Sequence, residues 1–208
     1  GLAHVQAARS RFDEAVVLYL KALALIPQPE YPAALGHVLV ASGRPSEARK
    51  HYDLVQYMGR LDAVNQVLYN RELAYFYADH DVKLDTALEF ARRELTVRQD
   101  IYAYDLLAWT LTKNGRHAEA QAAMTSALRL GTRDARLYYH AGMIAHALGN
   151  GDQARTQLAR ALALNPQFHV RHARVAADTL ASLNGTATSA SGPGSRAARP
   201  RTDSRPGS

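Results

Sequence analysis

The sequence predicts an all-α protein made of stacked helical hairpins. Two aligned series of small residues run along the chain with one period, and a short polar turn divides each period into two amphipathic stretches. The first series is spaced by 33, 38, 34 and 34 residues and the second by 33, 39, 33 and 34, so both expand at the same place. The first series is Ala3, Gly36, Ala74, Ala108 and Gly142. The second series is Ala15, Ala48, Ala87, Ala120 and Ala154. One such hairpin cannot bury its apolar face alone, so consecutive hairpins must stack.

The repeats divide the chain into about five units. These lie near residues 1–28, 29–58, 59–100, 101–134 and 135–166. Gly1 falls inside the first helix of the first unit, so we expect that unit to be truncated and the chain to be a fragment of a longer protein. The longer spacing between the second and third units places its extra residues in Val55–Tyr69, and we expect one or both helices there to be long.

Glycines and alanines have two predicted places in each unit. Turns at Val38–Gly43, Asn114–Gly115 and Leu148–Gly151 contain a glycine, which adopts the left-handed conformation that ends a helix. The aligned small residues are expected where two helices cross closely, with larger side chains such as Tyr52 and Leu158 around them.

The last part of the chain changes character after Pro166. Phe168–Leu183 carries an apolar stripe on one face, which predicts a capping helix over residues 167–183 that covers the end of the stack. From Asn184 the composition is Gly, Ser, Thr, Ala, Pro and Arg, with no apolar residue larger than alanine. We therefore expect residues 184–208 to be a disordered tail.

The clearest units resemble the tetratricopeptide repeat (TPR). The resemblance rests on Tyr104–Leu111, Asn114–Ala120, Tyr138–Gly142 and the later positions Leu158, Ala161 and Pro166. It implies a right-handed α-solenoid, a superhelix of stacked helical hairpins. Longer stretches, Arg71–His80 and Leu130–Met143, are similar to bacterial proteins with many such repeats, so the chain looks like the C-terminal portion of one.

Composition excludes several classes of function. The chain has no cysteine, which removes disulfide scaffolds, thiolate metal sites and cysteine nucleophiles. Half of the net charge of +6 lies in the tail after Leu183, and the remainder is too small to predict nucleic-acid binding. No apolar run approaches the ~18 residues of a membrane span, so we expect no membrane insertion by this fragment. The compartment stays open, with the cytoplasm as the default and the periplasm or secretion as alternatives.

No catalytic motif is present, so the sequence predicts no enzyme and no cofactor. The P-loop, the GxGxxG turn, the GxSxG elbow and the HExxH helix are all missing. Asp79-x-Asp81 begins like a calcium loop but lacks the glycine at the sixth place and the glutamate at the twelfth. A polar interhelical turn is therefore the better interpretation.

The nine histidines raise the question of a metal site. His169 and His172 are three residues apart, which places two ligands on one face of a helix. No third ligand lies nearby in the sequence, so the sequence predicts no metal site.

The resemblance also implies a functional surface. In stacked hairpins of this family the first helices line a concave groove, and three positions in each face it. The groove-facing residues most suited to binding a peptide are His37, Arg71, Tyr75, Asp105, Trp109, Tyr139, Met143 and His146. Aromatic anchors such as Trp109 are typical of binding hot spots, although these side chains alternatively pack between adjacent first helices. Of the positions that clamp a carboxylate in some repeats of this class, only Arg71 offers a suitable side chain, so we expect no such clamp here.

The sequence thus predicts a protein–protein interaction scaffold that binds a peptide or protein segment in a concave groove. The alternative is a regulatory or structural segment of a larger enzyme or transporter whose active part lies upstream. The identity of the partner and the oligomeric state stay open.

Overall fold

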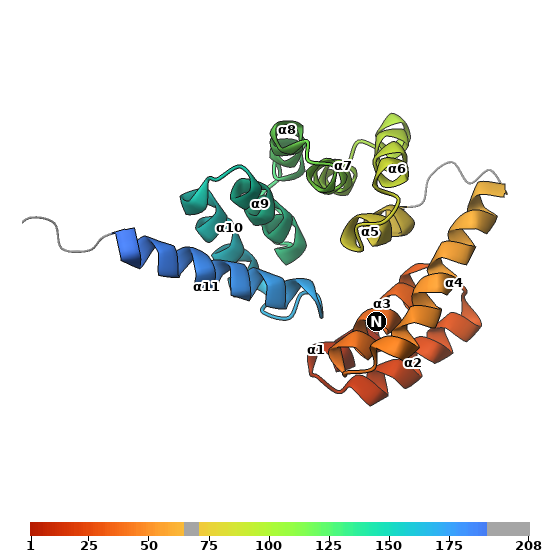
Figure 1. Cartoon of the computed structure of the whole chain (residues 1–208). Coiled ribbons are helices and arrows are strands. Elements are labelled where there is room, and N and C mark those ends of the chain that lie inside the picture. Colours follow the sequence, from red (N-terminus) through yellow and green to blue (C-terminus); the bar gives the residue numbers. More distant parts are fainter. Residues whose placement is uncertain (65–70, 191–208) are drawn as a thin grey trace, which may run out of the picture.

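The computed structural model describes residues 1–64 and 71–190, and every regular element within these ranges is an α-helix. Ten of the described helices pair into hairpins, and one more follows them (Figure 1). The pairs are α1 (Leu2–Ala8) with α2 (Phe12–Leu25), α3 (Glu30–Ala41) with α4 (Pro45–Val64), α5 (Arg71–Asp79) with α6 (Leu84–Val97), α7 (Ile101–Lys113) with α8 (His117–Ala127), and α9 (Ala135–Ala147) with α10 (Gly151–Leu164). The last helix is α11 (His172–Ala190).

The long helix expected after Val55 is α4. It has 20 residues and continues past the predicted unit boundary at residue 58 to Val64. The remaining residues of the expanded period, 65–70, lie outside the described residues. None of the helices in the described part of the chain is both long and apolar enough to cross a membrane.

The turns inside three hairpins contain a glycine with positive φ, as predicted. The values are +78° at Gly43, +73° at Gly115 and +76° at Gly149. Glycine adopts this left-handed conformation without the steric penalty that a Cβ brings. The first hairpin has Ser10 at the corresponding place, with φ of +59°.

The aligned small residues lie where helices approach most closely. A Cβ added to Gly36 would lie 2.2 Å from Cε1 of Tyr52, and one added to Gly142 would lie 2.7 Å from Cγ of Leu158. The predicted contacts are confirmed at these two hairpins, because no larger residue fits there unless its neighbour moves.

We expect Ala120→Leu to lower the free energy of unfolding by about 1–3 kcal/mol, the usual cost of overpacking a core. Ala120 is fully buried on α8, in a cluster with Leu88, Leu111 and Met124. A urea melt measures the effect, and Ala122→Leu, at an exposed position of the same helix, is the matched control. Equal urea midpoints for the two variants would mean that Ala120 does not mark a close helix contact.

The C-terminal helix differs from the predicted capping helix in both bounds. It begins at His172 rather than near residue 167, and it continues beyond Leu183 to Ala190. Residues 184–190, expected to be disordered, are therefore helical and continue α11. The rest of the expected tail, residues 191–208, lies outside the described residues.

The hairpins stack in order, and the chain then turns back on itself (Figure 1). The segment 165–171 leaves α10 and reaches the first hairpins, and α11, which follows it, packs on α10 and α9. Val170 in this segment packs against the core of the first two hairpins, which includes Ala7, Tyr19 and Leu35. The C-terminal segment therefore contacts the N-terminal end of the stack.

Candidate functional site

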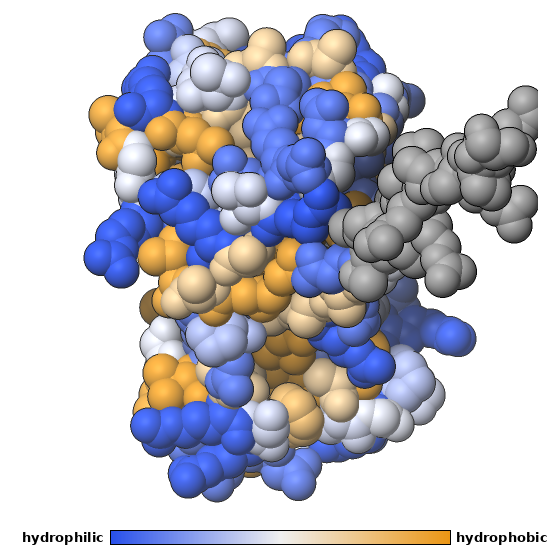
Figure 2. Space-filling view, turned by 90° about the vertical axis from the view of Figure 1, so that its left-hand side faces the viewer, coloured by the Kyte–Doolittle hydropathy of each residue, from blue (hydrophilic) through white to orange (hydrophobic). Residues whose placement is uncertain are grey.

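The concave side of the stack is largely filled by its own side chains. Segment 165–171 crosses it and borders a cavity of about 520 Å³ and another of about 780 Å³, both lined by His37 and His169. Figure 2 shows the molecule from this side. Apolar surface surrounds a hollow there, and the parts of the protein above and below the hollow are more hydrophilic. The smaller cavity lies between the first hairpins and helices α5 and α9, and the larger one borders α11.

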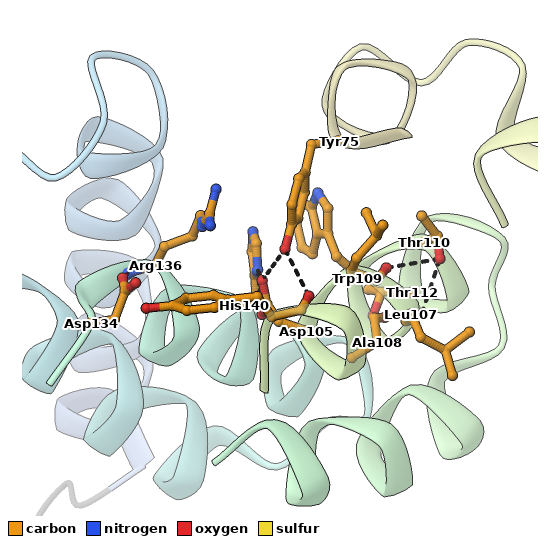
Figure 3. Close-up of polar contacts among 12 residues, drawn as sticks. Tyr75, Asp105, Leu107, Ala108, Trp109, Thr110, Thr112, Asp134, Arg136 and His140 are labelled. Atoms are coloured by element: carbon orange, nitrogen blue, oxygen red, sulfur yellow. Dashed lines mark hydrogen bonds and ion pairs between the residues drawn. The ribbon is translucent and has the colours of Figure 1, made fainter. Parts of the chain in front are cut away.

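A buried hydrogen-bonded network joins three first helices (Figure 3). The carboxylate of Asp105 on α7 accepts a hydrogen bond from the Tyr75 hydroxyl of α5 at 2.8 Å and from Nδ1 of His140 on α9 at 2.8 Å. The side chains of Asp105 and His140 are almost completely buried. Burial alone would raise the pKa of Asp105, but the facing His140, Arg136 and Tyr75 hold that pKa below its ordinary value.

Trp109 lies on the next turn of α7, in contact with the same network (Figure 3). Its ring stacks on His140 with centroids 4.3 Å apart, and its Nε1 donates a hydrogen bond to Oδ1 of Asp79 at 2.7 Å. Only 4% of Trp109 is exposed. Trp109 is therefore covered by other side chains and lines neither cavity.

Asp79 ends α5 and lies beside the start of α11. Its Oδ1 is 3.4 Å from Nε2 of His172, and its backbone oxygen accepts a hydrogen bond from Arg171 at 2.7 Å. The rings of His172 and His169 stack with centroids 4.2 Å apart. Asp79, His169 and His172 each offer one ligand atom, and these three atoms lie within 4.8 Å of one another.

A second pair of histidines adjoins this group. Nε2 of His37 on α3 lies 2.9 Å from Nε2 of His80, and the two rings are stacked. The His37 ring also meets the edge of His169, with centroids 5.0 Å apart. Burial lowers the pKa of all these histidines, to about 4 for His80 and about 3 for His169. The imidazoles are therefore neutral near pH 7.

Arg136 is the cationic side chain of the smaller cavity. Its guanidinium lies over the ring of Tyr75, 4.6 Å from the centroid, and it forms no ion pair with the residues that the structure describes. Glu72 lines the same cavity from α5 and is exposed. Although part of its surface is open to solvent, the loss of hydration inside the cavity raises the pKa of Glu72, and the positive charge of Arg136 opposes this shift.

The structure separates the predicted groove residues into three groups. Tyr75, Asp105 and Trp109 are buried in the network just described, and Tyr139 is buried beside it with its ring stacked on that of His172. His37 is half-buried and lines both cavities, and Met143 is half-buried against the core. His146 is exposed at the end of α9 and lines neither cavity.

Arg71, the one predicted candidate for a carboxylate clamp, already has internal partners. Its guanidinium pairs with the buried carboxylate of Glu94 on α6 and with Asp100 at 3.2 Å. Asp100 in turn caps α7 by accepting a hydrogen bond from the amide of Ala103 at 2.8 Å. Arg71 therefore ties the third hairpin to the fourth.

Sequence reasoning missed Asp79, His80, His140 and Arg136 as residues of this site. The pair His169 and His172 carried one local signal, a spacing of three residues. Asp79 carried a different one, since its turn begins like a calcium loop. Nothing local connects the two signals, because 90 residues separate Asp79 from His169.

Comparisons with known proteins agree with this architecture. The family described as tetratricopeptide repeat matches residues 111–178. Among solved structures, TTC0263, a thermophilic TPR protein of Thermus thermophilus, is similar with a TM-score of 0.54 and 19% identity, over 86% of this chain and 96% of that chain. No curated protein gives a significant match.

The family match covers helices from the end of α7 to the middle of α11, and the structural likeness extends the same fold over most of the chain. Both agree with the repeat of about 34 residues and with the paired helices. Residues 111–178 thus match the tetratricopeptide-repeat family, and the chain as a whole has the fold of a tetratricopeptide-repeat solenoid.

Proposed function

We propose that the protein is an interaction scaffold that binds a peptide or protein segment on the concave side of its repeats. Binding of protein partners is the usual role of tetratricopeptide repeats. One observation carries the finer proposal: an open cavity of about 520 Å³ contains a guanidinium, that of Arg136, which has no ion pair with the described residues.

The side chains around this cavity suit a segment with charges of both signs. Arg136 offers a planar donor fork, which recognises a carboxylate in bidentate geometry. Glu72 and Glu30 line the same cavity and are exposed, so they suit a lysine, an arginine or an amino terminus of the partner. Tyr31 and His37 add apolar and aromatic contact area.

The predicted groove residues have two roles in this proposal. His37 and Tyr75 line the cavity, and the ring of Tyr75 packs against the guanidinium of Arg136. Asp105, Trp109 and Tyr139 hold the cavity wall in place from the buried network rather than contacting the partner.

We expect Arg136→Gln to reduce retention of the cognate partner at least about tenfold, since a hydrogen bond to a charged group is worth about 1.5–3 kcal/mol. The full chain and its variants are immobilised and exposed to a lysate of the native host. Quantitative mass spectrometry then compares the amounts of each protein that they retain. Peptides from the retained partner are then titrated against each variant.

Arg92→Gln, at an exposed position of α6 away from both cavities, is the matched control. Circular dichroism of each variant checks that the helices are intact. The proposal fails if every retained protein binds the Arg136 and Arg92 variants equally.

A further inference from the structure

Histidines gather at one place in this fold far beyond what their number suggests. Five of the nine come together on the concave side: His37, His80, His140, His169 and His172. They come from α3, the turn after α5, α9, segment 165–171 and the start of α11, so folding alone assembles them. Only one acidic side chain, that of Asp79, joins two of these histidines in a candidate ligand group among the described residues.

We propose that Asp79, His169 and His172 bind a divalent transition-metal ion of the zinc class. Two imidazoles and one carboxylate are a common zinc ligand set, and the ion's fourth position is left to water. Thiolates are excluded because the chain has no cysteine. Imidazole ligands favour zinc, nickel, cobalt or copper over magnesium and calcium, which take oxygen ligands.

The separation of the ligand atoms supports this proposal. Two ligands about 2.0–2.1 Å from a tetrahedral ion lie about 3.3 Å apart. Nε2 of His172 and Oδ1 of Asp79 are 3.4 Å apart, too long for a good hydrogen bond but close to that edge length. All three ligand atoms lie within 4.8 Å of one another, so a small side-chain rotation completes the set.

The group also contains an unused nitrogen. Nδ1 of His172 is buried and has no hydrogen-bond partner, so in a ring that binds an ion through Nε2 it is the nitrogen that keeps the proton. Nδ1 of His169 accepts only two long contacts, 3.2 Å each, from the amides of Arg171 and His172 at the start of α11. Ion binding exchanges these weak contacts for a metal bond as the ring turns.

The protonation states of the two histidines and the contacts around Asp79 also favour metal binding. Burial lowers the pKa of His169 and of His172, so both imidazoles keep the lone pair that a metal requires near pH 7. The indole N–H of Trp109 holds the Asp79 carboxylate in place at 2.7 Å, as outer partners of metal ligands do. The Arg171 guanidinium, bonded to the backbone oxygen of Asp79, adds a positive charge that limits the affinity.

An ion at this place would tie distant parts of the fold together. Asp79 belongs to the third hairpin, whereas His169 and His172 belong to the crossing segment and α11. The ion would thus fix the C-terminal segment across the concave side.

Calorimetric titration of the chelator-treated full chain with Zn²⁺ tests the proposal. We expect one ion per chain and a melting temperature that rises by about 5–10 °C at a hundredfold excess over Kd. Co²⁺ should give the visible absorption of a tetrahedral site. Asp79→Asn, which keeps an oxygen that accepts from Trp109, and His169→Gln should each weaken Zn²⁺ binding at least about tenfold.

His146→Gln, at an exposed histidine of α9 outside both cavities, is the matched control and should bind Zn²⁺ like the unaltered chain. Circular dichroism without metal shows which variants are folded. If Asp79→Asn does not fold, the binding measured for His169→Gln tests the proposal. The proposal is overturned if the unaltered chain binds no Zn²⁺ at neutral pH. It is also overturned if the folded His169 variant binds as tightly as the His146 control.

Discussion

Replacing Trp109 by alanine should lower the free energy of unfolding by about 3–5 kcal/mol, the range for removing a large buried ring. Only 4% of the residue is exposed, and its ring stacks on His140 at 4.3 Å. The substitution also removes the N–H that bonds to Asp79 at 2.7 Å, which leaves a largely buried carboxylate with one donor fewer. Chemical denaturation followed by far-UV circular dichroism measures the loss.

Two further variants separate the parts of this effect. Trp109→Phe keeps most of the ring and removes the N–H, so it should retain more stability than the alanine variant. Tyr57→Ala removes an exposed aromatic residue from α4 and should leave the urea midpoint almost unchanged. If Trp109→Ala melts like the unaltered chain but loses partner binding, Trp109 contacts the partner directly and the covered conformation is not the one in solution.

Replacing Asp105 by alanine should cost about 3–5 kcal/mol, because it removes one member of a buried charged network. The Tyr75 hydroxyl and Nδ1 of His140 would both lose their acceptor inside the stack. The pKa of Asp105 is lowered in the folded state, so its contribution to stability is present above the ordinary carboxyl pKa. That contribution disappears as the pH falls through the lowered pKa. Urea midpoints at pH 7 and at pH 3 measure the loss and its pH dependence.

Asp178→Ala is the matched control, because Asp178 is an exposed carboxylate on α11 that should contribute little. Asp105→Asn keeps one oxygen acceptor and should lose less stability than Asp105→Ala. A pH-independent difference between the unaltered chain and Asp105→Ala would show that Asp105 is not ionised in the folded protein.

The repeat architecture was predictable because it is encoded locally. The period of small residues marks the close helix contacts, and Gly36 and Gly142 stand where no Cβ fits. The turn glycines Gly43 and Gly115 adopt the left-handed conformation that their position predicts. Each of these signals lies within one hairpin, so one sequence suffices to find it.

The site was less predictable because it depends on where the chain goes after the last hairpin. The register of α7 predicts that Trp109 faces a binding groove, but Trp109 is buried, with Asp79 and His140 from neighbouring hairpins packed against it. No period in the sequence encodes the path of segment 165–171 across that side. The meeting of Asp79 with His172 follows from this path alone.

The contact of Val170 with the first hairpins changes how the repeats share stability. In an open array each repeat interacts only with its neighbours, so stability is close to a sum of local terms and unfolding can spread from either end. Here the core around Ala7 and Tyr19 is also packed by a residue near the other end of the sequence. That long-range contact raises the contact order, which slows folding. It also links the fraying of one terminus to the loss of packing at the other, so the array should unfold as a more cooperative unit than its repeats alone imply.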